Sequence, residues 1–196
     1  GAELYDPLNN GKTVGRISGP VTFIPGVGIR LDTLLSHVAY QLPVTLTEGE
    51  ISLLVTNMPA NTEGGKTKLM AMAQGFDDIV TNDRRMTIEK RGEPPGIVAW
   101  RFITHVDQID AEVFVERRFV NFQANLTYFF QATWRNNFFN VIIREGGVNG
   151  PLIYEMGKHF EGRAYDPNPH VLYTGAPERR RGPEGASAEG ATIRQL

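Results

Sequence analysis

Apolar and polar residues alternate along most of this chain with a period of two, which is the period of a β-strand that has one buried face. The clearest example is the stretch FFQATWRNNFFNVIIRE, residues 129–145, in which two aromatic clusters flank an Asn-Asn pair. The 3.6-residue period of an amphipathic helix is nearly absent from the sequence. The pattern therefore predicts an all-β protein.

Turn motifs rich in Gly, Pro, Asn and Asp separate the alternating segments and divide them into about a dozen short strands. These motifs are IPGVG, TEGG, GEPPG, EGGVNGP and YDPNP. The expected strands are Val21–Leu31, Ser36–Gln41, Glu50–Asn57, Lys66–Gln74, Arg85–Lys90, Ile97–Thr104, Ala111–Phe119, Thr127–Arg135, Phe138–Arg144, Leu152–Glu155, His170–Thr174 and Ala191–Leu196. Short strands at regular spacing predict a two-sheet antiparallel β-sandwich or a barrel.

The chain reads as one domain over residues 1–196, because it contains no internal repeat and no linker long enough to divide it. Residues 175–190, GAPERRRGPEGASAEG, combine Gly, Pro, Ala and charge. This composition predicts a long surface loop before the last strand.

The Asn136-Asn137 pair predicts a two-residue type I′ hairpin turn, in which both central residues take positive φ angles. The turn sets the register, so that Arg135 faces Phe138 and each residue before it faces the matching residue after it. One face of the hairpin is then entirely apolar and should pack on the core. We therefore expect Trp134 to be buried rather than stacked on a sugar. This face comprises Tyr128, Phe130, Ala132, Trp134, Phe139, Val141 and Ile143.

Hydrogen-bonding residues alternate with that apolar face and are the candidates for ligand binding. The strand IVAWRFITHVD, residues 97–107, repeats the pattern, with Trp100 in phase with apolar neighbours and the polar residues in the other phase. An ordinary solvated sheet face is the alternative interpretation. The candidate ligand-binding residues are Arg101, His105, Gln131, Arg135, Asn140 and Arg144.

Composition narrows the classes of partner. A hydrophobic fraction of 41% and a charged fraction of 21% allow a substantial core. The net charge of -2, from 20 Lys+Arg and 22 Asp+Glu, creates no field that favours nucleic acid or an anionic membrane. No apolar run approaches the roughly 20 residues of a membrane-spanning helix. The absence of cysteine excludes disulfides, thiolate nucleophiles and Cys-ligated zinc.

The alternating strands, the early segment PVTFIPGVGIRL and the closing segment TGAPERRRGPEGASAEGATIRQL resemble the concanavalin A-like lectin and glucanase jelly rolls, which include laminin-G-like domains. The resemblance covers most of the chain and is one of pattern. It implies two curved antiparallel sheets whose concave face binds glycans in many members. The resembling group also includes glycoside hydrolases, polysaccharide lyases and adhesion modules. Its members often hold a structural calcium ion.

Candidate catalytic residues are sparse. Hydrolases of the resembling group carry Glu-x-Asp-x-Glu on one strand, and QIDAE at 108–112 supplies Asp110 and Glu112 but has Gln108 at the nucleophile position, which cannot form a glycosyl ester. A lyase needs a group that moves a proton, for which His105 or Tyr154 is a candidate. The Gln-x-His triplet of the jelly-roll alginate lyases is missing.

An acidic segment is the candidate metal site. QGFDDIVTND, residues 74–83, concentrates oxygen donors of the kind that calcium prefers, although without the spacing of a defined calcium loop. A solvated acidic turn is the alternative. The four histidines lack metal-ligand spacing. The candidate calcium ligands are Asp77, Asp78, Asn82 and Asp83, and the segment YDPNP adds Asp166 and Asn168.

Together these observations favour a β-sandwich that binds a poly- or oligosaccharide on its concave sheet. Arginine would be favoured where the sugar bears a carboxylate or sulfate, because its planar fork meets such groups with two parallel bonds. A glycan-degrading enzyme of the same fold and a protein-interaction or structural domain are the alternatives. We expect no nucleic-acid partner and no membrane span. The fold class favours a secreted, periplasmic or extracellular protein, and any signal peptide would have been removed before the Gly1-Ala2 start.

Overall fold

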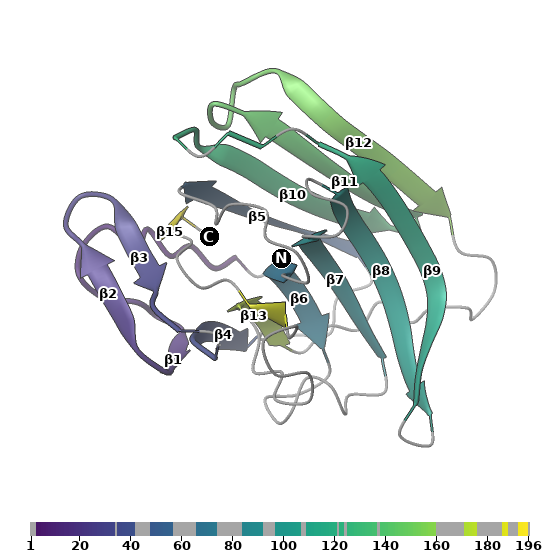
Figure 1. The fold of residues 1–196 in the computed structure, drawn as a ribbon, viewed down its shortest axis with the longest axis horizontal. Coiled ribbons are helices and arrows are strands. Elements are labelled where there is room, and N and C mark those ends of the chain that lie inside the picture. Colours follow the sequence, from purple (N-terminus) through teal and green to yellow (C-terminus); the bar gives the residue numbers. More distant parts are fainter. Residues whose placement is uncertain are drawn as a thin grey trace.

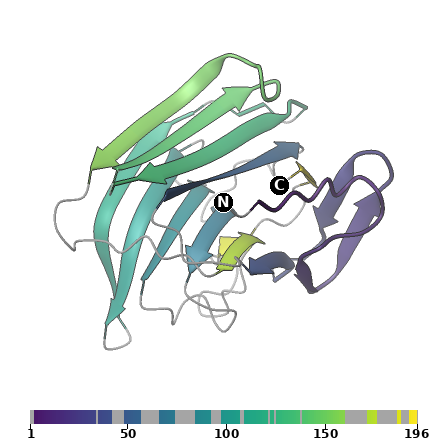
Figure 2. The ribbon, with the colours of Figure 1, turned by 180° about the vertical axis from the view of Figure 1, so that it is seen from behind.

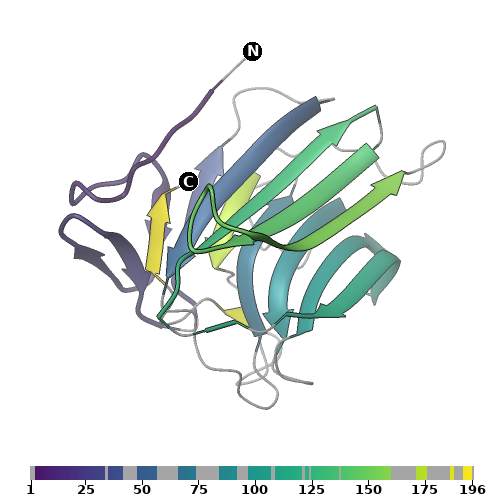
Figure 3. The ribbon, with the colours of Figure 1, turned by 90° about the horizontal axis from the view of Figure 1, so that it is seen from above.

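A computed structural model describes residues 3–33, 35–41, 48–56, 66–73, 84–91, 97–106, 109–120, 122–123, 125–136, 138–159, 171–175, 186–187 and 192–195. Within these ranges the regular structure consists of strands only, arranged as two sheets that face each other (Figures 1 and 3). Every neighbouring pair is antiparallel except β14 with β6. The predicted all-β sandwich with two antiparallel sheets is confirmed.

The described strands form an eight-stranded and a seven-stranded sheet, in which strands distant in sequence become neighbours. The eight-stranded sheet runs in the order β1 (Arg16–Ser18), β4 (His37–Gln41), β13 (Val171–Gly175), β6 (Lys66–Ala73), β7 (Arg84–Arg91), β8 (Ile97–Val106) and β9 (Ile109–Phe119), with β14 (Ala186–Ser187) beside β6. The seven-stranded sheet runs in the order β12 (Leu152–His159), β11 (Phe138–Glu145), β10 (Tyr128–Arg135), β5 (Glu48–Thr56), β15 (Thr192–Gln195), β3 (Gly28–Leu31) and β2 (Val21–Ile24).

The segment Val21–Leu31 corrects one strand prediction, because it forms the β2–β3 hairpin and not a single strand. The Val27 amide donates to the Ile24 carbonyl at 3.0 Å across the turn, and Gly26 has a φ of +73°. Proline followed by a glycine of positive φ is the signature of a type II turn. The strands β1 and β14 were not predicted, and β14 lies within the segment expected to be a surface loop.

The β10–β11 hairpin has the predicted register, with Arg135 opposite Phe138 and Trp134 opposite Phe139. Asn136 has a φ of +51°, as the predicted turn requires at that position. All seven residues of the predicted apolar face are buried, and Trp134 is 2% exposed. The prediction that this tryptophan belongs to the core is confirmed.

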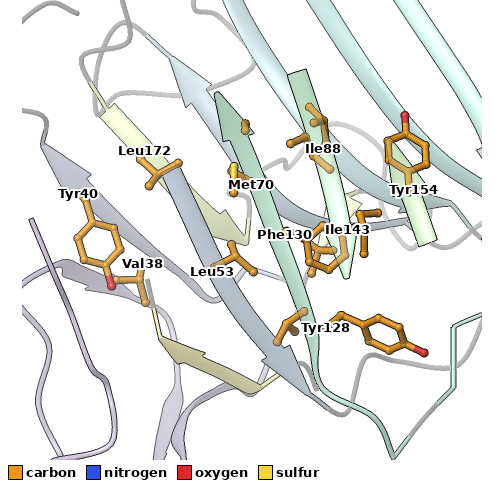
Figure 4. Packing of buried hydrophobic residues seen from close by; sticks show 14 of the residues in the cluster. Val38, Tyr40, Leu53, Met70, Ile88, Tyr128, Phe130, Ile143, Tyr154 and Leu172 are labelled. Atoms are coloured by element: carbon orange, nitrogen blue, oxygen red, sulfur yellow. The ribbon is translucent and has the colours of Figure 1, made fainter. Parts of the chain in front are cut away.

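The core lies between the two sheets. Met70 and Ile88 of the eight-stranded sheet belong to the same buried cluster as Phe130 and Ile143 of the other sheet (Figure 4). Burial of this apolar surface, at about 25 cal/mol per Å², is the main force that holds the sheets together. Among the described residues no helix has the length and apolar character to cross a membrane.

Two close contacts lock Trp134 in place. Its ring stacks on Phe139 with centroids 6.2 Å apart and an interplanar angle of 20°. On β5, a Cβ added to Gly49 would lie 2.5 Å from Cζ2 of Trp134, so the indole occupies the space that any larger residue would need. Glycine at position 49 therefore allows a large aromatic ring to pack directly on the neighbouring strand.

The N-terminal segment is attached to the eight-stranded sheet by a buried carboxylate. Asp6 is 1% exposed, and its Oδ2 accepts hydrogen bonds from Tyr40 Oη at 2.7 Å, Thr13 Oγ1 at 2.5 Å and the Val14 amide at 3.3 Å. Leu8 enters the core beside this network. A buried carboxylate with three donors is satisfied, and the loss of any donor leaves it under-bonded.

We expect Trp134→Ala to lower the free energy of unfolding by about 3–5 kcal/mol, because it removes a large buried ring from a packed site. The adjacent Arg135→Ala, which changes a side chain that is 77% exposed, should stay within about 0.5 kcal/mol of the parent. Urea unfolding, followed by far-ultraviolet circular dichroism, measures the free energy of unfolding of both variants. Equal stability of the two variants would contradict the assignment of Trp134 to the core.

Alkaline pH should destabilise the protein through Tyr40. Burial, and then the nearby Asp6, raise the pKa of Tyr40 above its usual value. Its contribution to stability is thus complete below about pH 10, the unfolded pKa. It is lost as pH rises above this, because only the unfolded chain releases the proton. Tyr40→Phe should make the alkaline fall in stability shallower by about 1.4 kcal/mol per pH unit.

The matched control for that measurement is Tyr5→Phe, which changes a tyrosine that is largely exposed. The comparison separates the removal of a hydroxyl from the buried Asp6 network from the removal of one at the surface. An unchanged slope in Tyr40→Phe would mean that the hydroxyl of Tyr40 is not held protonated by the fold.

Candidate functional site

Polar side chains line the face of β5, β10, β11 and β12 that points away from the core, which we call the outer face of the seven-stranded sheet. Because Ala132, Trp134 and Val141 point inward, the residues that alternate with them point outward. These four strands are neighbours in the sheet (Figure 2), and their register aligns the outward residues in rows. The rows are Glu48–Arg135–Phe138–His159, Glu50–Thr133–Asn140–Gly157 and Ser52–Gln131–Ile142–Glu155.

Arg135 lies at the hairpin end of this face. Its Nε is 3.3 Å from Oε2 of Glu48, and both side chains are largely exposed. An exposed ion pair of this kind contributes only about 0–1 kcal/mol to stability. Its effect is local: the carboxylate offsets the positive charge of the guanidinium.

Asn140 and Glu155 form a donor and acceptor pair in the middle of the face. Asn140 Nδ2 donates to Glu155 Oε2 at 3.3 Å. Beside them the aromatic ring of Phe138 is 47% exposed, although it also covers Gly157. A Cβ added to Gly157 would lie 2.7 Å from Cζ of Phe138 and 3.4 Å from Oδ1 of Asn140, so the ring and the amide border the same glycine.

Arg144 and Gln131 occupy the other end of the outer face. Arg144 Nη1 donates to the carbonyl of Gly150 at 3.1 Å, so this arginine holds the loop that follows β11. Gln131 is half-buried and lies opposite Ser52 of β5. Four of the six predicted ligand-binding residues, Gln131, Arg135, Asn140 and Arg144, therefore share one face.

The other two predicted residues lie in the other sheet. Arg101 and His105 are on β8, where Arg101 is opposite Thr87 of β7 and His105 is opposite Asp110 of β9. After β9 the chain crosses to the seven-stranded sheet at β10, so equal phase along the sequence does not bring β8 and β10 to one surface. The six residues thus form two separate groups, one on each sheet.

Comparison with solved structures finds proteins that share this fold at low sequence identity. The chain superposes on the CBM2 module of the evolved Dit of Lactobacillus casei BL23 phage J-1 with a TM-score of 0.62 and 8% identity, covering 98% of this chain and 92% of that one. Lectin II from Ulex europaeus gives a TM-score of 0.58 and 10% identity, covering 98% and 94%. The lectin UEA-II complexed with galactose gives the same values.

The fold is a lectin-type jelly-roll β-sandwich. The predicted resemblance to the concanavalin A-like group is confirmed at the level of the fold. The enzymatically active domain of tailspike protein 2 of bacteriophage CBA120 also matches, with a TM-score of 0.57 and 11% identity; the match covers 96% of this chain but only 27% of that one. The sequence matches no protein-family model and no curated protein.

Within this jelly roll, the candidate catalytic residues are divided between the two sheets. Asp110 and Glu112 are on β9, opposite His105 and Ile103 of β8, and Gln108 lies outside the described residues. Tyr154 is on β12 in the seven-stranded sheet and is 2% exposed. The Arg118 guanidinium lies 5.2 Å from its ring centroid and donates to the Glu155 carbonyl at 3.2 Å. Tyr154 is therefore a core residue, which counts against a role in moving a substrate's proton.

The candidate calcium ligands Asp77, Asp78, Asn82 and Asp83, with Asp166 and Asn168, all lie outside the described residues. In the part of the chain that the structure describes, no three His, Cys, Asp or Glu residues come together as metal ligands. The calcium site thus stays a prediction.

Three further side chains with shifted pKa values take part in packing or hydrogen bonds within the fold. Hydrogen bonds from Thr22, at 2.6 Å, and from Arg30 lower the pKa of Asp32 at the β2–β3 hairpin. Burial lowers the pKa of His37, whose Nδ1 is 2.9 Å from the carbonyl oxygen of Leu35. Burial also raises the pKa of Tyr128. All three groups lie outside the polar rows of the outer face.

Sequence reasoning missed the half of the outer face that comes from β5 and β12. Glu48, Glu50 and Ser52 become neighbours of β10 only through a strand pairing that spans about 80 positions of sequence. The alternation in EGEISLLVT, residues 48–56, marks these residues as outward-facing once the pairing is known. No local sequence pattern marks Gly157, because its role depends on the Phe138 ring of the neighbouring strand.

Proposed function

We propose that this domain binds a poly- or oligosaccharide. The observation that carries the proposal is the outer face of the seven-stranded sheet, where hydrogen-bonding side chains stand in aligned rows beside an exposed aromatic ring. Within each row, residues on neighbouring strands are separated by the strand spacing of about 4.8 Å. Sugar hydroxyls need both donors and acceptors, and here amide, hydroxyl and carboxylate groups from adjacent strands supply both.

The rigidity of this surface also supports the proposal. The opposite side of the same strands is the hydrophobic core, so the backbone positions of Gln131, Thr133 and Asn140 are held by packing. A preorganised surface loses less conformational entropy when a ligand binds. The structural neighbours agree with it, since they include lectins, one of them with galactose, and a phage CBM2 module.

Two surfaces are candidates for the glycan-binding site. The first is the outer face with Gln131, Arg135, Asn140 and Arg144, and the second is the region of β8 with Arg101 and His105. We favour the first, because it combines an exposed ring with a donor and acceptor pair on one face. The proposed setting is outside the cytoplasm, in keeping with the phage tailspike and phage module among the neighbours.

A glycan array with the parent chain, run with calcium and again with chelator, should identify at least one bound glycan. The double variant Gln131→Ala/Asn140→Ala should then reduce the affinity for that glycan at least tenfold, because it removes hydrogen-bonding groups and leaves sugar hydroxyls unpaired. Isothermal titration calorimetry measures the affinity. Loss of binding in chelator would support the predicted calcium site.

The matched variant Arg101→Ala/His105→Ala tests the other sheet. A loss confined to this variant would move the binding site to the eight-stranded sheet and keep the proposed function. The absence of any bound glycan on the array would contradict the function itself and would favour a protein-interaction or structural domain.

A glycan-degrading enzyme is the second candidate, supported by one specific observation. His105 and Asp110 are register partners across β8 and β9, and Glu112 follows two positions along β9. A titratable pair of this kind on neighbouring strands is the starting material for acid and base chemistry. Release of reducing ends or of unsaturated uronides from a bound polysaccharide, lost in His105→Ala, would establish the enzyme.

A further inference from the structure

We infer that Phe138 is the stacking platform of a sugar subsite that accepts a neutral pyranose, with Asn140 and Glu155 as its hydrogen-bonding pair. This subsite lies at the hairpin end of the outer face, where β10, β11 and β12 meet. The inference rests on the proposed function and specifies the class of sugar and the residues that bind it.

The position of the ring is the first step. Phe138 occupies an outward position on β11, one residue before the buried Phe139. A single exposed aromatic is common on protein surfaces. This ring differs because its Cζ and Cε2 atoms lie over Gly157, in the place that a Cβ there would occupy. The backbone of β12 thus supports part of the ring while almost half of the residue faces solvent.

The polar groups beside the ring are the second step. Asn140 follows Phe138 by two positions on β11, so both side chains lie on the outer face about 7 Å apart along the strand. The Asn140 amide also borders Gly157, and its Nδ2 donates to Glu155 Oε2 at 3.3 Å. The Asn140 amide can donate to one sugar hydroxyl, and the Glu155 carboxylate can accept from the hydroxyl next to it.

Charge is the third step and sets the class of sugar. Arg135, the register partner of Phe138, is offset by Glu48 at 3.3 Å. On β12 the register partner of Phe138 is His159, and Glu155 supplies a further carboxylate four residues before it, next to Asn140. A uronate or sulfate bound to the Asn140–Glu155 pair would be repelled by Glu155, and to pair with Arg135 it would have to displace Glu48. A neutral pyranose has an apolar ring face for Phe138 and carries no charge to be repelled.

The competing explanation is that the ring only covers a glycine. Aromatic side chains across from glycine stabilise neighbouring strands by restoring the packing that glycine lacks. Under that explanation Phe138→Ala changes stability and leaves sugar binding as it was. The two explanations are therefore separated by measuring both properties on the same variants.

The experiment uses the whole chain and two variants that alter the platform in different ways. Phe138→Ala removes the ring, whereas Gly157→Ala leaves the ring in the chain and displaces it with a new Cβ. The control is Leu152→Ala, which truncates an exposed apolar residue on the same strand as Gly157. Phe138→Trp retains a platform. Thermal unfolding and circular dichroism establish that each variant is folded.

The probes are cello-, manno- and galacto-oligosaccharides as neutral ligands and oligogalacturonides as acidic ones, titrated by calorimetry. We expect Phe138→Ala and Gly157→Ala to weaken binding of the best neutral probe at least tenfold. Leu152→Ala should stay within about threefold of the parent, since it leaves the ring platform intact. Phe138→Trp should bind more tightly than Phe138→Ala, since it keeps an aromatic ring at this position. The parent should prefer the neutral probes to the acidic ones.

Distinct outcomes separate the failure of this inference from the failure of the proposed function. Binding that survives in folded Phe138→Ala and Gly157→Ala, or that is lost only in Arg101→Ala/His105→Ala, overturns the platform and leaves glycan binding in place. A preference for oligogalacturonides overturns the neutral class. A parent chain that binds no glycan on the array or in the titrations overturns both.

Discussion

The register of the β10–β11 hairpin is the constraint on which the rest of this structure depends. Side chains alternate between the two faces of a strand, so a shift of one residue would exchange the core and the surface along the whole hairpin. The Asn136 turn and the packing of Trp134 against Phe139 and Gly49 exclude such a shift. The same packing that buries the tryptophan therefore points Gln131 and its polar neighbours to solvent.

The outer face derives its order from this core. Each outward residue is attached to a backbone whose opposite side is packed, and the neighbouring strands β5 and β12 hold their own outward residues in register with it. Glycine contributes on both sides of the sheet, with Gly49 admitting the buried indole and Gly157 supporting the exposed Phe138. The two aromatic residues differ in position: Trp134 is buried in the core, whereas Phe138 is exposed on the outer face.

The division of the candidate residues between two sheets changes how the function should be sought. A jelly roll has two outer surfaces, and the phase of polar residues along a strand does not reveal to which of them the strand contributes. The strand β8, which carries Arg101 and His105, and the β10–β11 hairpin, which carries the other group, thus belong to opposite sheets of the sandwich. Tyr154 shows the same limit, because its place in the sequence suggested a reactive hydroxyl and its place in the fold is interior.

The sequence by itself determined the all-β class, the hairpin register and the burial of Trp134, because these follow from local alternation and from turn residues such as Asn136. It misread residues 21–31 as one strand, although the Pro25-Gly26 turn motif lies within them, because apolar residues continue on both sides of the turn. Strand order, the pairing of β5 with β10 and the position of Phe138 over Gly157 were decided by the tertiary structure. Such contacts join residues far apart in the chain, and their pairing depends on packing energy that no local pattern records.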